Sequence, residues 1–515
     1  MSLPRDPKSR QFPLRPLTRR RFVTGSLAGI ALTACNSSTR RRADGAVVDE
    51  LDPTPLPNPE PEPIPDTEVP GPMMPRGLHS SLVGDSHTSR TITWFTDGED
   101  APVSWLEFSS FELGLDEFSI QDDAFENSVE ASTSQTTGIE SFTHRASAVG
   151  IDPDRPLRYR VGSDEGGWSA VYVVMPSPRD EWSFIHFGDH GIGELPKLVT
   201  EEVMRTPADL LMLAGDLSYA NGDQEIWDVW FEQMQPLLAR RLTMAAPGNH
   251  EEKDFGGDTF KNRFSHPPKP LTSSFGPSDP GSTFYSFDFN RVHFLVTTAG
   301  ALIGDGTLPE ELLNIEADLA NASLRRLRGE IDFIIVMQHF TIWTDQLDRS
   351  PANFTLVALE ENIFLRYGVD LVIVGHDHIY QRSAPMFLGL PNPLGYVQMM
   401  VGTGGASIRL LDDDGTQSWS EKAFVGIGFA HYKVSKGKIN IEYIGAPPLD
   451  MSDIGRQYSE GKFEVLDSVE IKAKSLLACS QCAKPARGQE VLLQNFEAIA
   501  AHTKDRNRRA LQHCG

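Results

Sequence analysis

The hydrophobic positions of the chain follow two different patterns, one before and one after residue 180. Between residues 76 and 178, short runs in which apolar and polar residues alternate are separated by turn residues, as in 90–98 (RTITWFTDG) and 157–163 (LRYRVGS). Alternation with a period of two is typical of strands that bury one face. Short strands at this spacing predict a small β-sandwich.

After residue 181 the apolar runs become continuous and alternate with longer amphipathic stretches. The runs are WSFIHF, DLLMLAG, LTMAAPG, DFIIVMQH and DLVIVGH, and helical patterns occupy 225–241 and 309–327. Buried strands alternating with helices are typical of a largely parallel sheet. We therefore predict an α/β domain over 181–445, with a hairpin at 282–300. The polar region 446–515 is predicted only as a C-terminal extension of unknown role.

Residues 1–35 predict an export signal. A twin-arginine pattern, TRRRF, precedes an apolar run of about a dozen residues, which is too short to span a bilayer. The run ends in Leu-Thr-Ala-Cys, which resembles a bacterial lipobox, so Cys35 is predicted to be acylated. We expect a cell-envelope protein anchored by lipid after twin-arginine export. Asn36 favours the outer membrane or the cell surface, and a plain signal peptide is the alternative.

The next segment and the overall charge restrict the partners. Residues 36–75 are rich in Pro and acidic residues and predict an extended tether. The chain carries a net charge of −24, although residues 1–35 hold seven Lys or Arg and one Asp. The remaining chain is therefore still more acidic, which argues against a nucleic-acid partner. An anionic substrate would need a local positive centre.

Each apolar strand of the α/β domain is followed by a residue that can bind a metal ion. In chain order the strand ends carry Asp189; Asp216 with Tyr219; Asn249 with His250; His339; and His376 with His378. One such residue is weak evidence, because a lone histidine is more often structural. The carboxyl ends of strands in an α/β sheet converge on one crevice, so we expect these side chains to meet.

The chemistry of this set points to transition metals. Carboxylate and amide oxygens mixed with imidazoles suit iron, manganese or zinc better than calcium. The number of donors suits two ions with one bridging carboxylate. Two such ions clamp a phosphoryl group and generate hydroxide near neutral pH.

The five blocks also resemble a known signature. They are Gly188-Asp189-x-Gly191, Gly215-Asp216-x-x-Tyr219, Gly248-Asn249-His250-Glu251, Val336-x-x-His339 and Gly375-His376-x-His378. In order and spacing they resemble those of the purple acid phosphatases, a branch of the calcineurin-like metallophosphoesterases, and the likeness covers about residues 75–445. It implies an α/β metallophosphoesterase sandwich after a fibronectin-like β-sandwich at 76–178. It also implies phosphomonoester hydrolysis by metal-bound hydroxide, an acid phosphatase activity.

The resemblance assigns a role to each block. Asp189, Tyr219 and His378 would hold Fe(III), which a tyrosinate favours. The second, divalent metal (Fe, Zn or Mn) would be held by Asn249, His339 and His376. Asp216 would bridge the two ions. His250 would be catalytic, by contacting phosphate or assisting proton transfer, with loop orientation as its structural alternative.

One part of the family pattern is missing. Family members often have further histidines shortly after the fourth block, whereas residues 340–355 contain none. Five residues are candidates for a substitute: His186, His190, Asp345, Asp348 and Arg349. None is assigned, so the general acid stays open.

Other readings of the chain remain open. The same centre suits a phosphodiesterase or a pyrophosphatase, and a surface binding protein with a vestigial metal site is a further alternative. For Cys479, Cys482 and Cys514, a disulfide is favoured over a zinc site with His502 or His513. The expected partner is a small phosphorylated substrate, whose identity stays open together with the oligomeric state.

Overall fold

The computed structural model describes residues 71, 73–98, 101–112, 124–136, 138–269, 282–301, 308–347, 349–412, 417–446 and 463–474. The predicted export signal with Cys35, nearly all of the predicted tether, Asp348 and the three C-terminal cysteines lie outside these residues.

The first part of the described chain is an all-β sandwich, as the alternating pattern predicts. Its strands are β1 (Arg76–Ser81), β2 (Ser89–Thr96), β3 (Trp105–Ser110), β4 (Asn127–Glu130), β5 (Ser132–Ser134), β6 (Phe142–Val149), β7 (Leu157–Ser163), β8 (Gly167–Trp168) and β9 (Tyr172–Val174). One layer contains β1, β2, β6 and β5, and the other contains β3, β4, β7, β8 and β9. The layers bury a shared core that includes Ile92, Trp94, Leu106 and Tyr159.

The second part alternates strands and helices. Its strands are β10 (Trp182–Phe187), β11 (Leu210–Ala214), β12 (Leu242–Ala246), β13 (Tyr285–Phe289), β14 (Val292–Val296), β15 (Phe333–Met337), β16 (Leu371–Val374), β17 (Tyr380–Ser383), β18 (Met386–Phe387), β19 (Leu390–Pro391), β20 (Val397–Val401), β21 (Ser420–Phe424), β22 (Gly428–Ser435), β23 (Lys438–Gly445) and β24 (Glu464–Lys472). Its helical segments are α2 (Glu194–Arg205), α3 (Gln224–Leu238), α4 (Asn249–Glu252), η1 (Phe255–Gly257), α5 (Asp258–Arg263), α6 (Leu308–Leu327), α7 (Phe354–Leu356), the π-helical η3 (Val357–Glu361) and α8 (Asn362–Tyr367). The predicted hairpin is confirmed as the antiparallel pair β13–β14.

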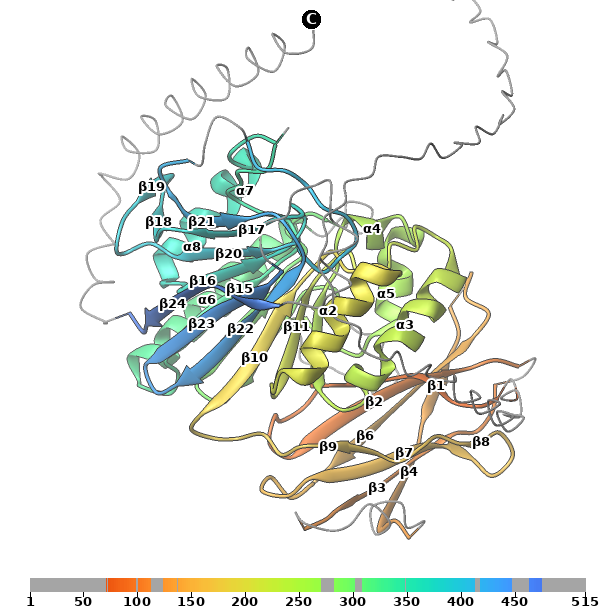
Figure 1. The fold of residues 1–515 in the computed structure, drawn as a ribbon. Coiled ribbons are helices and arrows are strands. Elements are labelled where there is room, and N and C mark those ends of the chain that lie inside the picture. The colour runs from red at the N-terminus through yellow and green to blue at the C-terminus, as the bar shows by residue number, and fades with distance from the viewer. Residues whose placement is uncertain are drawn as a thin grey trace, which may run out of the picture. The chain divides into compact units, whose positions relative to one another are not determined.

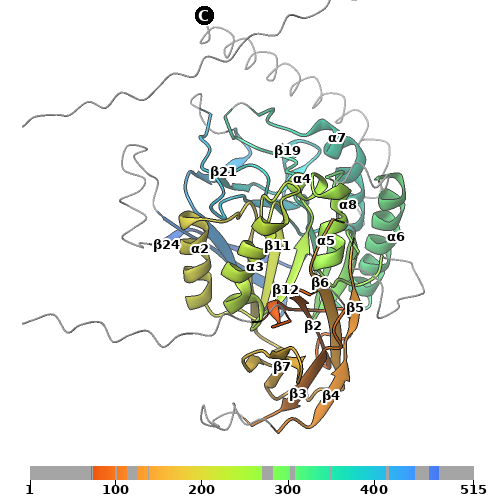
Figure 2. The same ribbon diagram turned by 90° about the vertical axis from the view of Figure 1, so that its right-hand side faces the viewer.

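Most of these strands, together with four strands of the sandwich, form two large sheets that pack face to face, and β18 and β19 form a separate pair. The first has the order β24-β23-β22-β10-β11-β12-β1-β2-β6-β5, and the second has the order β13-β14-β15-β16-β20-β17-β21. Helices α2 and α3 lie beside the first sheet, and α6 and α8 lie on the outer side of the second (Figures 1 and 2). The result is a four-layer sandwich of helices, sheet, sheet and helices.

The alternation of side chains along the strands explains this layering. In β15, Ile335 and Met337 point into the core between the two sheets, whereas Ile334 and Val336 point toward α6 and α8. A strand with apolar residues on both faces is stable only when both faces are covered. The continuous apolar runs of the sequence are therefore a direct consequence of the four layers.

The β-sandwich and the α/β part share one sheet. Strand β1 pairs in parallel with β12, with Ser80 opposite Leu242, so the layer containing β2, β6 and β5 continues the first large sheet. At the other edge of that sheet, β24 pairs with β23. Strand β24 lies in the predicted C-terminal extension 446–515, so part of that polar region is an edge strand of the α/β sheet.

Two helices show recognisable end signals. Helix α3 begins after Asp223, whose side chain accepts a hydrogen bond from the backbone N–H of Glu225, as is typical of an N-cap. Helix α8 ends at Gly368, which adopts a left-handed conformation with φ of 74°. Within the described residues, no helix is both long and apolar enough to cross a membrane.

Candidate metal centre

The predicted ligands lie together where strands of both large sheets end. Strands β10, β11 and β12 of the first sheet run into the loops of Asp189, Asp216 and Asn249. Strands β15 and β16 of the second sheet run into the loops of His339 and His376. The sequence predicts that these side chains meet in the crevice of one open sheet. The structure instead builds the site from the facing edges of two sheets.

Three of the predicted ligands form a first group. The Tyr219 hydroxyl lies 3.1 Å from Asp189 Oδ1 and 3.1 Å from His378 Nε2. The distance from His378 Nε2 to Asp189 Oδ1 is 3.2 Å. These are the three residues predicted to hold iron, and their donor atoms converge on one point.

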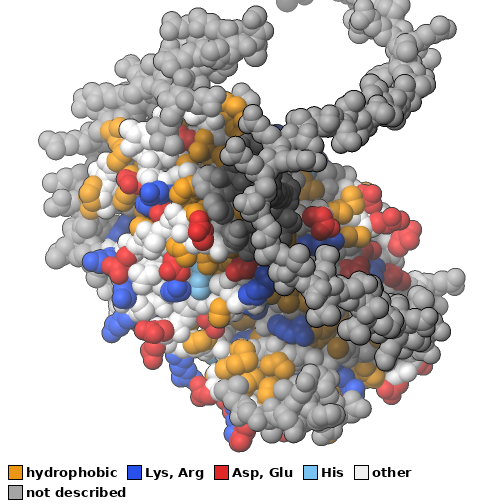
Figure 3. All heavy atoms as spheres, viewed as in Figure 1, with side chains coloured by type: hydrophobic (Ala, Val, Ile, Leu, Met, Phe, Trp, Pro, Cys, Tyr) orange, Lys and Arg blue, Asp and Glu red, His pale blue; other side chains and the backbone are white. Residues whose placement is uncertain are grey.

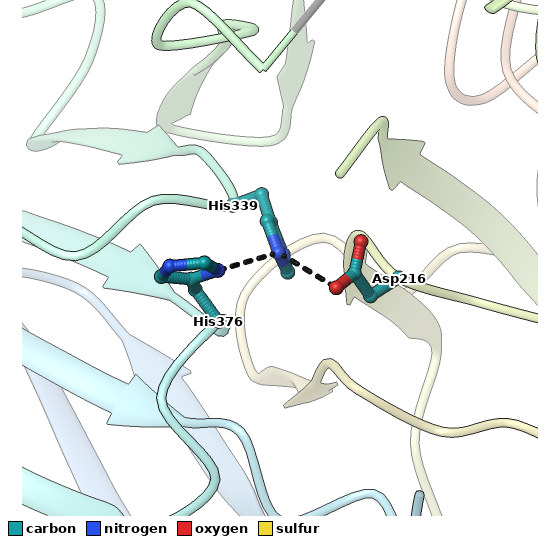
Figure 4. Close-up of side chains that lie close together, drawn as sticks. All are labelled: Asp216, His339 and His376. Carbon is teal, nitrogen blue, oxygen red and sulfur yellow. Dashed lines mark hydrogen bonds and ion pairs between the residues drawn. The ribbon is translucent and has the colours of Figure 1, made fainter. Parts of the chain in front are cut away.

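A second group is formed by Asp216, His339 and His376 (Figure 4). His339 Nε2 lies 3.2 Å from Asp216 Oδ2 and 3.2 Å from His376 Nδ1. The side-chain oxygen of Asn249, which begins α4, is buried and has no hydrogen-bond partner. An orphaned buried oxygen beside other donors is costly unless a ligand satisfies it.

Hydrogen bonds behind the ligands fix how two of the histidines present their rings. His339 Nδ1 lies 2.7 Å from the Ala214 carbonyl oxygen, so Nδ1 carries a proton and Nε2 is directed toward Asp216. His378 Nδ1 lies 3.1 Å from the Ser407 carbonyl oxygen, which directs its Nε2 toward Asp189 and Tyr219. Outer contacts of this kind set the tautomer of metal-binding histidines.

The backbone at the site is strained. Among the described residues, nine non-glycine residues have positive φ, and four of them are predicted ligands: Asp189 (58°), Asp216 (51°), Tyr219 (60°) and His376 (71°). The left-handed region is unfavourable for such residues. Strain of this type concentrates at functional sites, where the surrounding structure holds it in place.

Glycines of the sequence blocks make room for the ligands. A Cβ atom on Gly248 would lie 2.2 Å from Asp216 Oδ1, and a Cβ atom on Gly375 would lie 2.6 Å from Asp189 Oδ2. Both distances are far below van der Waals contact. These two positions therefore require glycine because a carboxylate of the site packs directly against the backbone.

The ionisable groups are strongly coupled. Burial favours a neutral imidazole at His339, but the Asp216 carboxylate outweighs it and raises the pKa of His339 to about 10. Burial and the charge of His339 lower the pKa of His376 to about 2. Burial and the Asp189 carboxylate raise the pKa of Tyr219. In the protein alone, His339 therefore holds a proton that the Asp216 carboxylate stabilises, whereas His376 is neutral. A cation bound between the donors would replace the proton of His339.

The structure separates the candidates for a general acid. His190 is buried, with Nε2 at 3.1 Å from the Pro196 carbonyl and Nδ1 accepting a bond from Trp230. His186 is buried beside Tyr432, and the Asp345 carboxylate accepts from Gln381. Of the candidates among the described residues, Arg349 is the one that lines the cavity at the centre.

His250 lies at the edge of the second group. Its Nδ1 lies 2.6 Å from Asn221 Oδ1, and its Nε2 lies 3.8 Å from Asp216 Oδ2. The residue lines a cavity of about 440 Å³ together with Asp216, Tyr219, Asn249, His376 and His378. Its position allows contact with a ligand held at the centre.

Sequence reasoning gave no role to Glu251, which connects the second and third loops. Its carboxylate accepts hydrogen bonds from the backbone N–H groups of Gly248 (2.7 Å), Asp216 (2.8 Å) and Leu217 (2.9 Å). Glu at the third position of a helix is a known capping signal. That signal accounts for the contact to Gly248, whereas the contacts to Asp216 and Leu217 come from packing between distant loops.

The donor set therefore fits a pair of metal ions. Oxygen and imidazole atoms converge in two neighbouring groups, Asn249 Oδ1 lacks a partner, and outer contacts direct Nε2 of two histidines into these groups. This combination suits borderline transition metals. The ligand role of each residue remains a prediction.

Comparisons with known proteins agree with this architecture. Residues 183–380 match the calcineurin-like phosphoesterase family, and residues 75–175 match the purple acid phosphatase N-terminal domain. Purple acid phosphatase 18 of Arabidopsis thaliana is 26% identical over 334 residues, which cover 64% of this chain and 71% of that protein. Fe(3+)-Zn(2+) purple acid phosphatase 12 of the same plant is 25% identical over 394 residues, covering 70% and 78%.

A solved structure shows the same fold. The structure of a purple acid phosphatase from yellow lupin (Lupinus luteus) seeds superposes with a TM-score of 0.62 at 19% identity, covering 80% of this chain and 77% of that chain. This chain therefore combines a purple acid phosphatase N-terminal domain with a calcineurin-like phosphoesterase domain, and its relatives include purple acid phosphatases.

Proposed function

We propose that this protein is a phosphomonoesterase with acid phosphatase activity that works at a dinuclear Fe(III)–M(II) centre. The observation that carries the proposal is the pair of donor groups at the wall of the 440 Å³ cavity. Purple acid phosphatases are phosphoric ester hydrolases, and one relative is named for an iron–zinc pair.

The two donor groups suggest which residues would hold each ion. Asp189, Tyr219 and His378 would hold the ferric ion, because a phenolate is a hard anionic ligand. His339, His376 and Asn249 would hold the divalent ion, and the buried Asp216 would bridge. When bound, the metal pair polarises the phosphoryl group and activates the attacking water.

The charge balance of the site suits an anionic substrate. Two carboxylates and one phenolate carry fewer negative charges than a ferric–divalent pair carries positive charges, so the centre keeps a local positive charge. The chain as a whole carries a net charge of −24. The metal centre would therefore supply the attraction for phosphate that the rest of the protein lacks.

Residues around the centre would position the substrate and a proton. His250 is held through Nδ1 by Asn221, which leaves Nε2 facing the second donor group. From there it would contact the phosphoryl group or assist proton transfer. Glu251 would keep the loops of Asp216 and Asn249 in register through its three backbone contacts.

The test combines metal content, colour and hydrolysis. Purified protein should contain iron and a second metal, hydrolyse nitrophenyl phosphate, and show a visible charge-transfer band. Tyr219→Phe should bleach the band while the protein stays folded by circular dichroism. Iron-loaded wild type without such a band would contradict the ferric–tyrosinate assignment. Absence of hydrolysis by metal-loaded protein would contradict the proposed activity.

We further propose that the protein is exported and anchored to the cell envelope through Cys35. Support comes from the twin-arginine pattern and the Leu-Thr-Ala-Cys motif of the sequence. Labelling cells with a fatty-acid probe should mark the wild type, and Cys35→Ala should lose the label. Full membrane retention of the unlabelled variant would contradict lipid anchoring.

A further inference from the structure

The cavity at the metal centre contains two arginines that the proposed metal chemistry does not use. Arg349 and Arg409 line it together with Gln346 and Ser407. The cavity volume of about 440 Å³ is within the usual range of small-molecule sites. It is much larger than one phosphate group needs, so the substrate has room for a second functional group.

Arg349 is anchored close to the ligands. Its Nε lies 3.1 Å from Oδ1 of Asp377, a fully buried residue between His376 and His378. The Arg349 side chain itself is 46% exposed. Since Asp377 engages Nε, the two terminal nitrogens of the guanidinium are available to a ligand in the cavity.

Arg409 comes from the other side of the His378 loop. Its backbone N–H donates to the His378 carbonyl oxygen at 3.3 Å, and Ser407 holds the His378 ring. The Arg409 side chain is exposed, and within the described part of the chain it forms no ion pair. An arginine in a binding cavity without an acidic partner is a site for an anion.

The two arginines belong to one rim of the cavity. Gln346 forms an isolated β-bridge with Leu411, and the Leu347 N–H donates to the Leu410 carbonyl oxygen at 2.8 Å. These contacts hold the segment that leads to Arg349 beside the segment that follows Arg409. The rim is therefore a built element with two guanidinium groups.

The pair of arginines differs from the mixed charge of the protein surface. On the face shown in Figure 3, the coloured acidic and basic side chains are interspersed. A chain with a net charge of −24 attracts anions only where cationic groups are concentrated. Two arginines on one rim of the cavity meet that condition, and guanidinium groups bind phosphate and carboxylate through paired hydrogen bonds.

We propose that Arg349 and Arg409 form an anion subsite for a second acidic group of the substrate, so that the preferred substrates are phosphomonoesters whose leaving group carries another phosphate or a carboxylate. This inference rests on the proposed phosphatase function. The scissile phosphate would occupy the metal centre, and the second anion would lie against the arginine rim.

Matched substrate pairs test the subsite. We compare kcat/KM for fructose 1,6-bisphosphate with fructose 6-phosphate, and for 3-phosphoglycerate with glycerol 3-phosphate. Wild type should prefer the doubly acidic member of at least one pair by about fivefold to tenfold, as expected for one charge-assisted contact. Arg409→Gln should bring that ratio close to one, mainly through KM. The first pair reports a phosphate and the second a carboxylate.

Two further variants separate charge from structure. Arg409→Lys keeps the charge and should retain part of the preference. Arg328→Gln removes an exposed arginine outside the cavity, whose partner is Glu330, and should leave the ratios unchanged. A wild type without preference, or an Arg409→Gln variant with the wild-type ratio, would overturn the subsite.

The subsite proposal can fail while the phosphatase proposal holds, and the two failures give different results. Hydrolysis of monoesters with equal ratios in wild type and Arg409→Gln contradicts the subsite alone. If the metal-loaded protein hydrolyses no ester, calorimetry with pyrophosphate and with phosphate replaces the kinetic comparison. Pyrophosphate binding that is weakened selectively by Arg409→Gln would support the subsite, and equal binding in both proteins would overturn it.

Discussion

His144 in the β-sandwich and His339 at the end of β15 are both fully buried, yet their ring nitrogens face different partners. His144 lies 2.8 Å from the Thr96 hydroxyl and 2.9 Å from the Thr133 hydroxyl. A hydroxyl donates or accepts as required, so a neutral His144 satisfies both nitrogens. In His339, Nδ1 contacts the Ala214 carbonyl, whereas Nε2 faces a carboxylate and another imidazole.

This difference separates a structural polar group from a ligand. In the sandwich, each ring nitrogen of His144 has a hydroxyl partner. At the strand ends, carboxylate and imidazole groups face one another, and four of the residues adopt left-handed backbone. Burial alone is therefore uninformative, and the balance of donors and acceptors around a buried group identifies the site.

Removing the predicted bridging ligand should have the largest effect. Asp216→Ala should lower metal content and reduce kcat/KM for nitrophenyl phosphate by more than about 10³-fold, because both ions lose a ligand. Asp467→Asn is a matched control, since Asp467 is a buried carboxylate bound to Tyr380 and Arg382. It should lower stability but leave metal content unchanged. Equal metal loss in both variants would contradict the assignment of Asp216.

Replacing His250 should discriminate between esters. A general acid contributes about 10²–10⁴-fold, mainly for leaving groups that need a proton. Without an alternative acid, wild type should cleave aryl phosphates well and alkyl phosphates slowly. His250→Ala should then reduce kcat/KM more for alkyl than for aryl phosphates. Equal losses on both would make His250 a phosphate-binding residue, and a flat leaving-group dependence in wild type would reveal another acid.

Adding one methyl group by a Gly→Ala substitution should affect metal binding at the metal centre but not in the sandwich. Gly248→Ala places Cβ against the Asp216 carboxylate and should weaken metal binding by about 10–100-fold, as for other residues that orient ligands. Gly150 in the sandwich has positive φ, unlike Gly248, and has open space around it. Gly150→Ala should cost about 1 kcal/mol of stability without changing metal affinity. Metal titration and thermal unfolding measure both effects.

The smallest effect on activity is expected at His144, whose contribution is to stability. Burial, with a further effect from Arg145, lowers the pKa of His144 to about 4. The unfolded state gains the proton near pH 6.5, so stability from this group is complete above that pH and is lost as pH falls toward 4. The loss amounts to about 3 kcal/mol.

His144→Gln should therefore reduce the pH dependence of unfolding between pH 6.5 and 4 relative to wild type, with activity at pH 7 unchanged. Chemical denaturation across this range measures the difference. An identical pH dependence in both proteins would contradict a buried neutral histidine at this position.

The sequence by itself determined the succession of elements and the identity of the donors. Alternating runs predicted strands such as β2, β6 and β7, and continuous apolar runs predicted β10, β11, β12, β15 and β16. These patterns arise because each strand or helix buries residues at regular intervals along the chain. The strand-end residues were recognisable because their chemistry differs from that of the apolar strands before them.

Tertiary structure alone decided how these parts meet. The site is built from two facing sheets, and β1 joins the sandwich to the sheet of β12. Glu251, Ala214 and Ser407 acquire their supporting roles only because distant loops are brought into contact. The placement of Arg349 beside Asp377, while His186 and His190 are directed elsewhere, likewise depends on packing between segments far apart in sequence, which no local pattern encodes.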